Sequence, residues 1–108
     1  MSIGSPNPEI LINAWIKSER ETWLQVHWSC SSAAAIAFTG VLDKSSSTAD
    51  VVLVVNEVPP LKGVASLSLL KEKGAEVTAL EGARLRVQYG ADVVVEVRQV
   101  HAPGASVV

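Results

Sequence analysis

The sequence contains a single cysteine, Cys30, so the chain cannot form an internal disulfide or a metal site built from several thiolates. One thiol suits a reducing compartment, and we expect a cytoplasmic location. The N-terminus lacks the basic start and apolar core of a signal peptide, and no apolar run approaches the roughly 18 residues that a transmembrane helix needs. From these absences we expect that the protein does not associate with a membrane.

Charged residues are also scarce, at 19% of the chain, and the formal net charge is −2. Such a chain lacks the excess of positive charge that attracts nucleic acid or an anionic membrane surface. Hydrophobic residues make up 48%, and a small domain with so few charges leaves apolar surface exposed, which favours a homo-oligomer or a protein partner. The length fits a single domain, residues 1–108, with flexible tails at 1–6 and 101–108.

The motifs of common enzyme classes are missing as well. The chain has no HExxH, no GxSxG and no glycine-rich phosphate loop. Cys30 and His27 are three residues apart on an expected strand, so they point to opposite faces and cannot act as nucleophile and base. His101 could reach a site only through the tertiary fold. We favour a non-enzymatic protein and assign no catalytic residue, cofactor or metal ligand.

The sequence is rich in period-two patterning, which is clearest between Ala83 and Val100. Apolar and polar residues alternate on both sides of Gly90, and this predicts a β-hairpin. A three-residue loop at 90–92 pairs Val87 with Val95, whereas a two-residue loop would place charged residues opposite apolar ones. The three-residue loop is therefore predicted.

The same patterning divides the rest of the chain. Asn7 before Pro8 and Glu9 is a helix start, so residues 8–20 are predicted as a helix, although its isoleucines also alternate as in a strand. Alternation predicts further strands at 22–30, 34–42, 50–56, 64–70 and 75–80. The predicted fold is mainly β: an N-terminal helix, then about seven antiparallel strands in a small barrel or sandwich, with a C-terminal four-strand meander.

A helix before a small barrel, with the stretch from Phe38 to Asp43 in its second strand, is similar to Sm-like barrels. The remaining chain has no second matching motif, more strands, and none of the basic nucleotide-binding signals. The resemblance therefore assigns no function.

Two groups of residues are candidate binding sites. Trp23 and His27 share one face of a predicted strand, where an exposed aromatic residue could anchor an interface. The hairpin register places Arg84 opposite Arg98 with Arg86 nearby, and such a cationic patch could bind a carboxylate or phosphate. Neighbouring glutamates could equally neutralise the patch on an ordinary solvated sheet face.

These features predict a non-enzymatic interaction domain that self-associates through apolar β surface. The surface would be the uncharged run from Val51 to Val55 or the strand that carries Trp23 and Trp28. The alternative is a carrier of a small apolar ligand, in which the N-terminal helix covers the mouth of the barrel. Small residues between Ala33 and Ala37 weakly favour the carrier, because they leave interior space.

Overall fold

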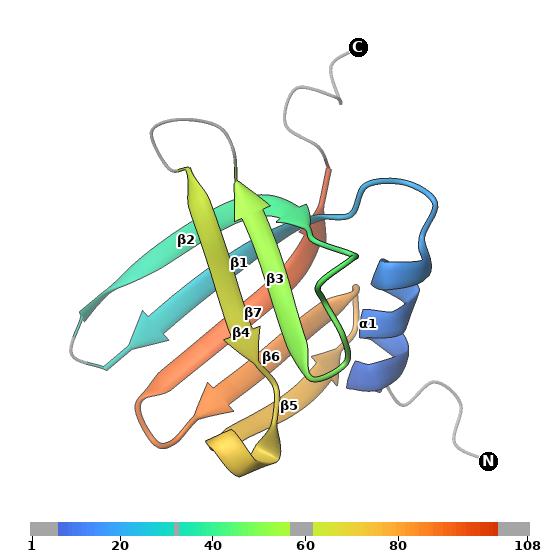
Figure 1. Cartoon of the computed structure of the whole chain (residues 1–108). Coiled ribbons are helices and arrows are strands. Elements are labelled where there is room, and N and C mark those ends of the chain that lie inside the picture. The colour runs from blue at the N-terminus through green and yellow to red at the C-terminus, as the bar shows by residue number, and fades with distance from the viewer. Residues whose placement is uncertain (1–6, 32, 57–61, 102–108) are drawn as a thin grey trace.

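The computed structural model describes residues 7–31, 33–56 and 62–101. Its strands form one seven-stranded sheet in the order β4-β3-β2-β1-β7-β6-β5, every neighbouring pair is antiparallel, and the sheet curls into a half-barrel (Figure 1). The elements are α1 (Pro8–Lys17), β1 (Trp23–Cys30), β2 (Ala33–Leu42), β3 (Val51–Asn56), β4 (Gly63–Ser68), the short 3₁₀ helix η1 (Lys71–Lys73), β5 (Ala75–Leu80), β6 (Arg84–Tyr89) and β7 (Val93–Val100). The predicted mainly β fold with an N-terminal helix is confirmed. Except for His101, the predicted tails lie outside the described residues.

The helix α1 begins where the sequence predicts. The Asn7 side-chain oxygen accepts hydrogen bonds from the backbone N–H groups of Glu9 (2.9 Å) and Ile10 (3.2 Å), which would otherwise lack partners. The helix ends at Lys17, three residues earlier than predicted, because Ser18 leaves the helical conformation with ψ 139°.

One face of α1 closes an end of the half-barrel. The helix contacts β5, and its side chains Ile12 and Trp15 are only 1% and 3% exposed and belong to the core. The buried Thr22 hydroxyl donates to the backbone oxygen of Trp15 (3.1 Å), which fixes the end of the helix to the start of β1.

The tight turns set the registers of the hairpins, and the predicted pairing of Val87 with Val95 is confirmed. The loop between β6 and β7 pairs Val87 with Val95, and the loop before β6 pairs Val77 with Val87. The turn between β1 and β2 pairs Val26 with Phe38. Because opposite residues share a face, these pairs stack apolar side chains on the concave side of the sheet. The buried core of the strands comprises Leu24, Val26, Leu42, Val52, Val54, Ala65, Leu67, Ala75, Ala79, Leu85, Val87, Val95 and Val97.

The four C-terminal strands follow one another along the chain as predicted, but their hydrogen bonding differs at the first. β5, β6 and β7 lie side by side, whereas β4 pairs with β3. Just after β4 the backbone N–H of Leu69 donates to the oxygen of Asp50 (2.7 Å), and η1 then redirects the chain. β4 and β5 are therefore the two edges of the sheet.

Gly40 in β2 is the point at which the sheet folds over itself. β3 pairs with β2 only at Val41 and Leu42. Gly40 lies opposite the buried Leu24, and a Cβ atom at Gly40 would lie 2.4 Å from the backbone oxygen of Val55. Only glycine allows β3 to approach this closely. β3 and β4 thus cross the concave side (Figure 1), and among the described residues no strand pairs with the first half of β2 on that edge.

A hydrogen bond also joins the two walls of the half-barrel. The Tyr89 hydroxyl on β6 donates to the backbone oxygen of Ser68 on β4 (2.6 Å). Burial raises the pKa of Tyr89 above its ordinary value of 10.0. The bond holds β4 in place although β4 and β6 are not neighbours in the sheet.

Candidate functional site

The first candidate surface is the part of β2 that β3 does not pair with, residues 35–39, which we call the uncovered segment. Further along the chain, the Leu42 N–H donates to the oxygen of Thr22 beside β1, and the Asp43 N–H donates to the oxygen of Leu53 on β3. Backbone groups alternate in direction along a strand. The groups that point away from β1 in the uncovered segment therefore belong to its odd-numbered residues, Ala35, Ala37 and Thr39.

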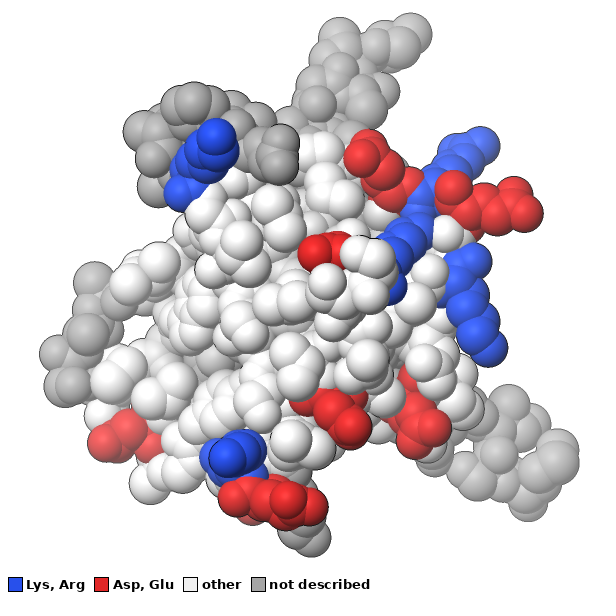
Figure 2. Space-filling view, viewed as in Figure 1, with Lys and Arg blue, Asp and Glu red and all other residues white. Residues whose placement is uncertain are grey.

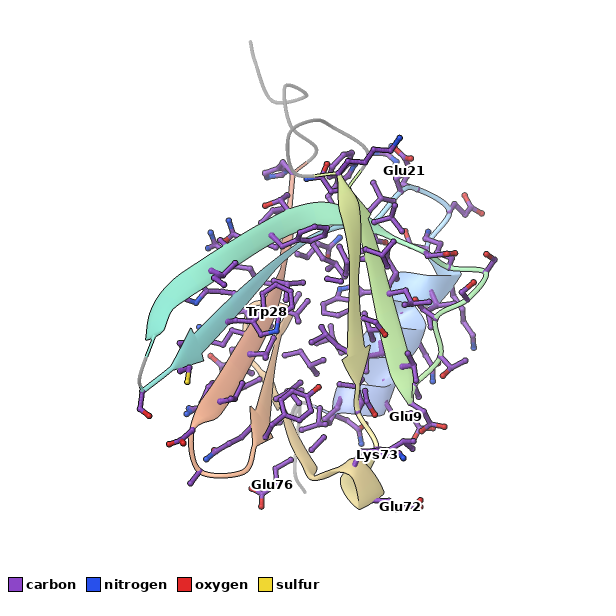
Figure 3. All side chains as sticks on the ribbon, turned by 60° about the vertical axis from the view of Figure 1, so that its left-hand side comes forward. Glu9, Glu21, Trp28, Glu72, Lys73 and Glu76 are labelled. Carbon is purple, nitrogen blue, oxygen red and sulfur yellow. The ribbon has the colours of Figure 1, made fainter. Side chains whose placement is uncertain are left out.

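Apolar side chains lie beside this edge of β2. Ile36 is 63% exposed, while Phe38 and Trp28 are partly buried against the core. Trp28 on β1 lies opposite Ile36 on β2, and Figure 3 shows Trp28 on the concave side of the sheet. In the same strand and on the same face, Leu42 is only 3% exposed. Side chains on this face of β2 are therefore buried where β3 packs on the strand and exposed where it does not.

The surroundings of this surface carry little charge. No residue from Ser31 to Leu42 is charged. On the side of the molecule seen in Figure 2, most of the surface over β3 and β4 is uncharged, and Lys, Arg, Asp and Glu lie mainly toward its margins. Uncharged surface beside a free strand edge is typical of a site where another strand binds.

The second candidate surface lies on the convex face of the sheet and contains most of the predicted binding residues. Adjacent strands β6, β7 and β1 bring their polar side chains together around a hollow of about 260 Å³. The residues that line the hollow are Gln25, His27, Arg84, Glu96 and Arg98. Of the predicted set, His27, Arg84 and Arg98 are thus neighbours. Arg86 is exposed on the same face, opposite Glu96.

Two hydrogen bonds fix the arginines of the hollow. The Arg98 Nε donates to the side-chain oxygen of Gln25 (3.0 Å), and the Arg84 Nε donates to the backbone oxygen of Glu81 (3.0 Å). Both acceptors are uncharged. The arrangement can therefore present two oriented guanidinium groups to an anion.

The structure places the other predicted contact residues away from any free edge. Trp23 lies at the start of β1, half-buried, opposite Val41 on β2 and Val100 on β7. The apolar run in β3 pairs with β4 along its whole length. On its other side it bonds to β2 and to the loop at 43–48, and its residues Val52 and Val54 are fully buried. Sequence patterning missed the uncovered segment, although a glycine inside an apolar strand signals a close backbone approach.

His27 and Cys30 lie on opposite faces as expected, because β1 pairs with β7 without interruption from Trp23 to Cys30. Within residues 7–31, 33–56 and 62–101, no group of three or more His, Cys, Asp or Glu side chains could hold a metal ion. Neither α1 nor η1, the helices in the described part of the chain, is long and apolar enough to cross a membrane.

Comparison with protein-family models, curated protein sequences and solved structures gives no significant match for this chain. We therefore infer function from the two surfaces.

Proposed function

We propose that the chain is a non-enzymatic protein-interaction domain that self-associates through the uncovered segment of β2. The observation that carries this proposal is the exposure of Ile36, 63%, in a stretch of β2 that pairs with no strand besides β1 among the described residues. Soluble proteins usually protect a free strand edge with charged residues or proline. Residues 31–42 contain neither, so this edge is suited to pairing with another strand.

A second copy of the chain fits this edge well. If two uncovered segments pair antiparallel about a two-fold axis at Ala37, Ile36 of each copy lies opposite Phe38 of the other. Ala35 then lies opposite Thr39, and no like charges meet. Ala37 is the middle of the uncovered segment. A shift of the axis toward Gly40 would push the second copy against β3, which already lies close to Gly40.

The arrangement around α1 also favours interaction over the alternative of an apolar-ligand carrier. The helix covers one end of the half-barrel, as a carrier would require. However, its side chains Ile12 and Trp15 are buried in the core beneath it. Close packing at this end leaves the apolar excess of the chain to an external partner.

Sedimentation velocity tests the proposal. We expect the wild type to be a dimer and Ile36→Asp to be a monomer, because a buried unpaired carboxylate at the centre of the interface is strongly unfavourable. Val64→Asp is the matched control, since Val64 is 61% exposed but lies on β4, and it should remain a dimer. Thermal melting checks that each variant is folded. A monomeric wild type, or a folded Ile36→Asp variant that remains dimeric, contradicts the proposal.

A further inference from the structure

The hollow on the convex face contains an arrangement of charge that the fold itself does not require. The register places Arg84 directly opposite Arg98, and facing like charges destabilise a pair of strands. On its other side, Arg98 faces the neutral Gln25. An anion held between the two arginines would convert this unfavourable pair into a binding site.

The one acidic side chain in the hollow has a cationic neighbour of its own, Arg86. Glu96 lies opposite Arg86 on β6 and opposite His27 on β1. Glu96 and Arg98 are two residues apart on β7. Arg98 itself has no acidic residue directly opposite it, because it faces Arg84 on β6 and Gln25 on β1. The positive charge of the convex face is consequently concentrated at the end of the hollow formed by Arg84 and Arg98.

The hydrogen bonds of these arginines leave donors for a ligand. Each guanidinium group has five N–H donors in a planar fork, which matches phosphate oxygens in pairs. The hydrogen bonds from Arg98 Nε to Gln25 and from Arg84 Nε to Glu81 each use one of these donors. Each bond also restricts the position of its guanidinium group. Both guanidinium groups therefore keep N–H donors from which a compact dianion could accept hydrogen bonds.

From this geometry we propose that the hollow binds the phosphate group of a small phosphate monoester between Arg84 and Arg98. The volume of about 260 Å³ fits a small molecule, since it lies just below the range of about 300–1,000 Å³ typical of drug-sized ligands. Gln25 and His27 line the same hollow and can hydrogen-bond to the rest of the ligand. The hollow lies on the face opposite to Ile36, although its residues Gln25 and His27 lie opposite Thr39 and Ala37 of the uncovered segment.

Nuclear magnetic resonance titration with glycerol 3-phosphate and with inorganic phosphate tests this site, at an ionic strength kept constant with sodium chloride. The Ile36→Asp variant serves as the background, so that association does not obscure the spectra. Both ligands should cause saturable shifts in the backbone amides of the residues that line the hollow. Arg84→Gln and Arg98→Gln should each weaken binding about tenfold or more, because each removes charged hydrogen bonds.

Arg86→Gln is the matched control. It removes the same charge from the same face and strand as Arg84→Gln, but Arg86 does not line the hollow. It should weaken binding by less than about threefold, because only the long-range electrostatic attraction of Arg86 for the anion is lost. Shifts that do not saturate, or an equal loss of binding in all three variants, would overturn the proposal, because either result describes nonspecific attraction to a basic surface.

Discussion

The two halves of β2 differ in cover more than in composition. Both are apolar and uncharged, and both pair with β1. Leu42, in the second half, is 3% exposed, whereas Ile36, on the same face six residues earlier, is 63% exposed. The second half lies under β3, and the first does not. Burial in this strand is therefore decided by where another segment crosses it, and the crossing point is Gly40.

This comparison shows how one sheet can supply both a core and an exposed apolar surface. The same alternation of side chains continues along β2, so no change of pattern marks the boundary between its halves. The boundary arises because the absence of a side chain at Gly40 lets β3 leave the β2 edge and cross the concave face. An apolar strand that extends beyond its neighbour can offer its backbone groups to another strand.

The largest expected effect is a difference in stability between variants in the two halves of β2. Leu42→Ala should reduce the free energy of unfolding by about 3 kcal/mol, because it leaves a cavity in the core. Ile36→Ala should reduce it by less than about 0.5 kcal/mol when the protein is dilute enough to be monomeric, since Ile36 already contacts water. Urea denaturation measures both values. Similar losses for the two variants would show that Ile36 is also covered within the monomer.

A smaller effect is expected at the crossing point. Gly40→Ala should cost about 2 kcal/mol, because its Cβ would lie 2.4 Å from the Val55 oxygen and β3 would have to move. Gly63→Ala is the control: Gly63 is also in a strand, but nothing lies within 4 Å of its Cβ position. It should change stability by less than about 0.5 kcal/mol. Equal stabilities of the two variants in urea denaturation would contradict the close approach.

The smallest effect concerns the bond that holds β4 across the concave side. Tyr89→Phe should cost about 1 kcal/mol at pH 7, because it removes only the hydroxyl that donates to Ser68. The pKa of Tyr89 is raised in the folded state, so its contribution is complete below the unfolded value near 10 and is lost as the pH rises through the folded value. Urea denaturation from pH 7 to 11 should show the two proteins converging. A constant difference would exclude the hydroxyl as the cause.

The parts of the fold that the sequence predicts are those fixed by short turns. The loops at 81–83 and 90–92 leave few registers, and alternation selects the one that keeps Val77, Val87 and Val95 on a single face. The Arg84–Arg98 pair of the convex hollow follows from the same register. The patterning within a hairpin is thus sufficient where neighbours in the chain are also neighbours in the sheet.

The remaining features depend on pairings between distant segments. Nothing in the alternation of β1 indicates that it pairs with β7, so Gln25 and His27 could not be placed beside Arg98 from the sequence. In the same way, the pairing of β3 with β4 and the crossing at Gly40 are tertiary. The exposure of Ile36 follows from these long-range contacts, and local patterning does not contain it.

The most direct test of self-association through the uncovered segment is oxidative cross-linking of an Ala37→Cys variant. In the proposed two-fold pairing the two Ala37 residues lie opposite each other, with Cα atoms about 5.5 Å apart, a separation that a disulfide spans. We predict a covalent dimer on non-reducing gels for Ala37→Cys, and none for the wild type, which carries only Cys30, or for Val64→Cys. Failure of Ala37→Cys to form the dimer, or equal cross-linking through Val64→Cys, would contradict self-association through β2.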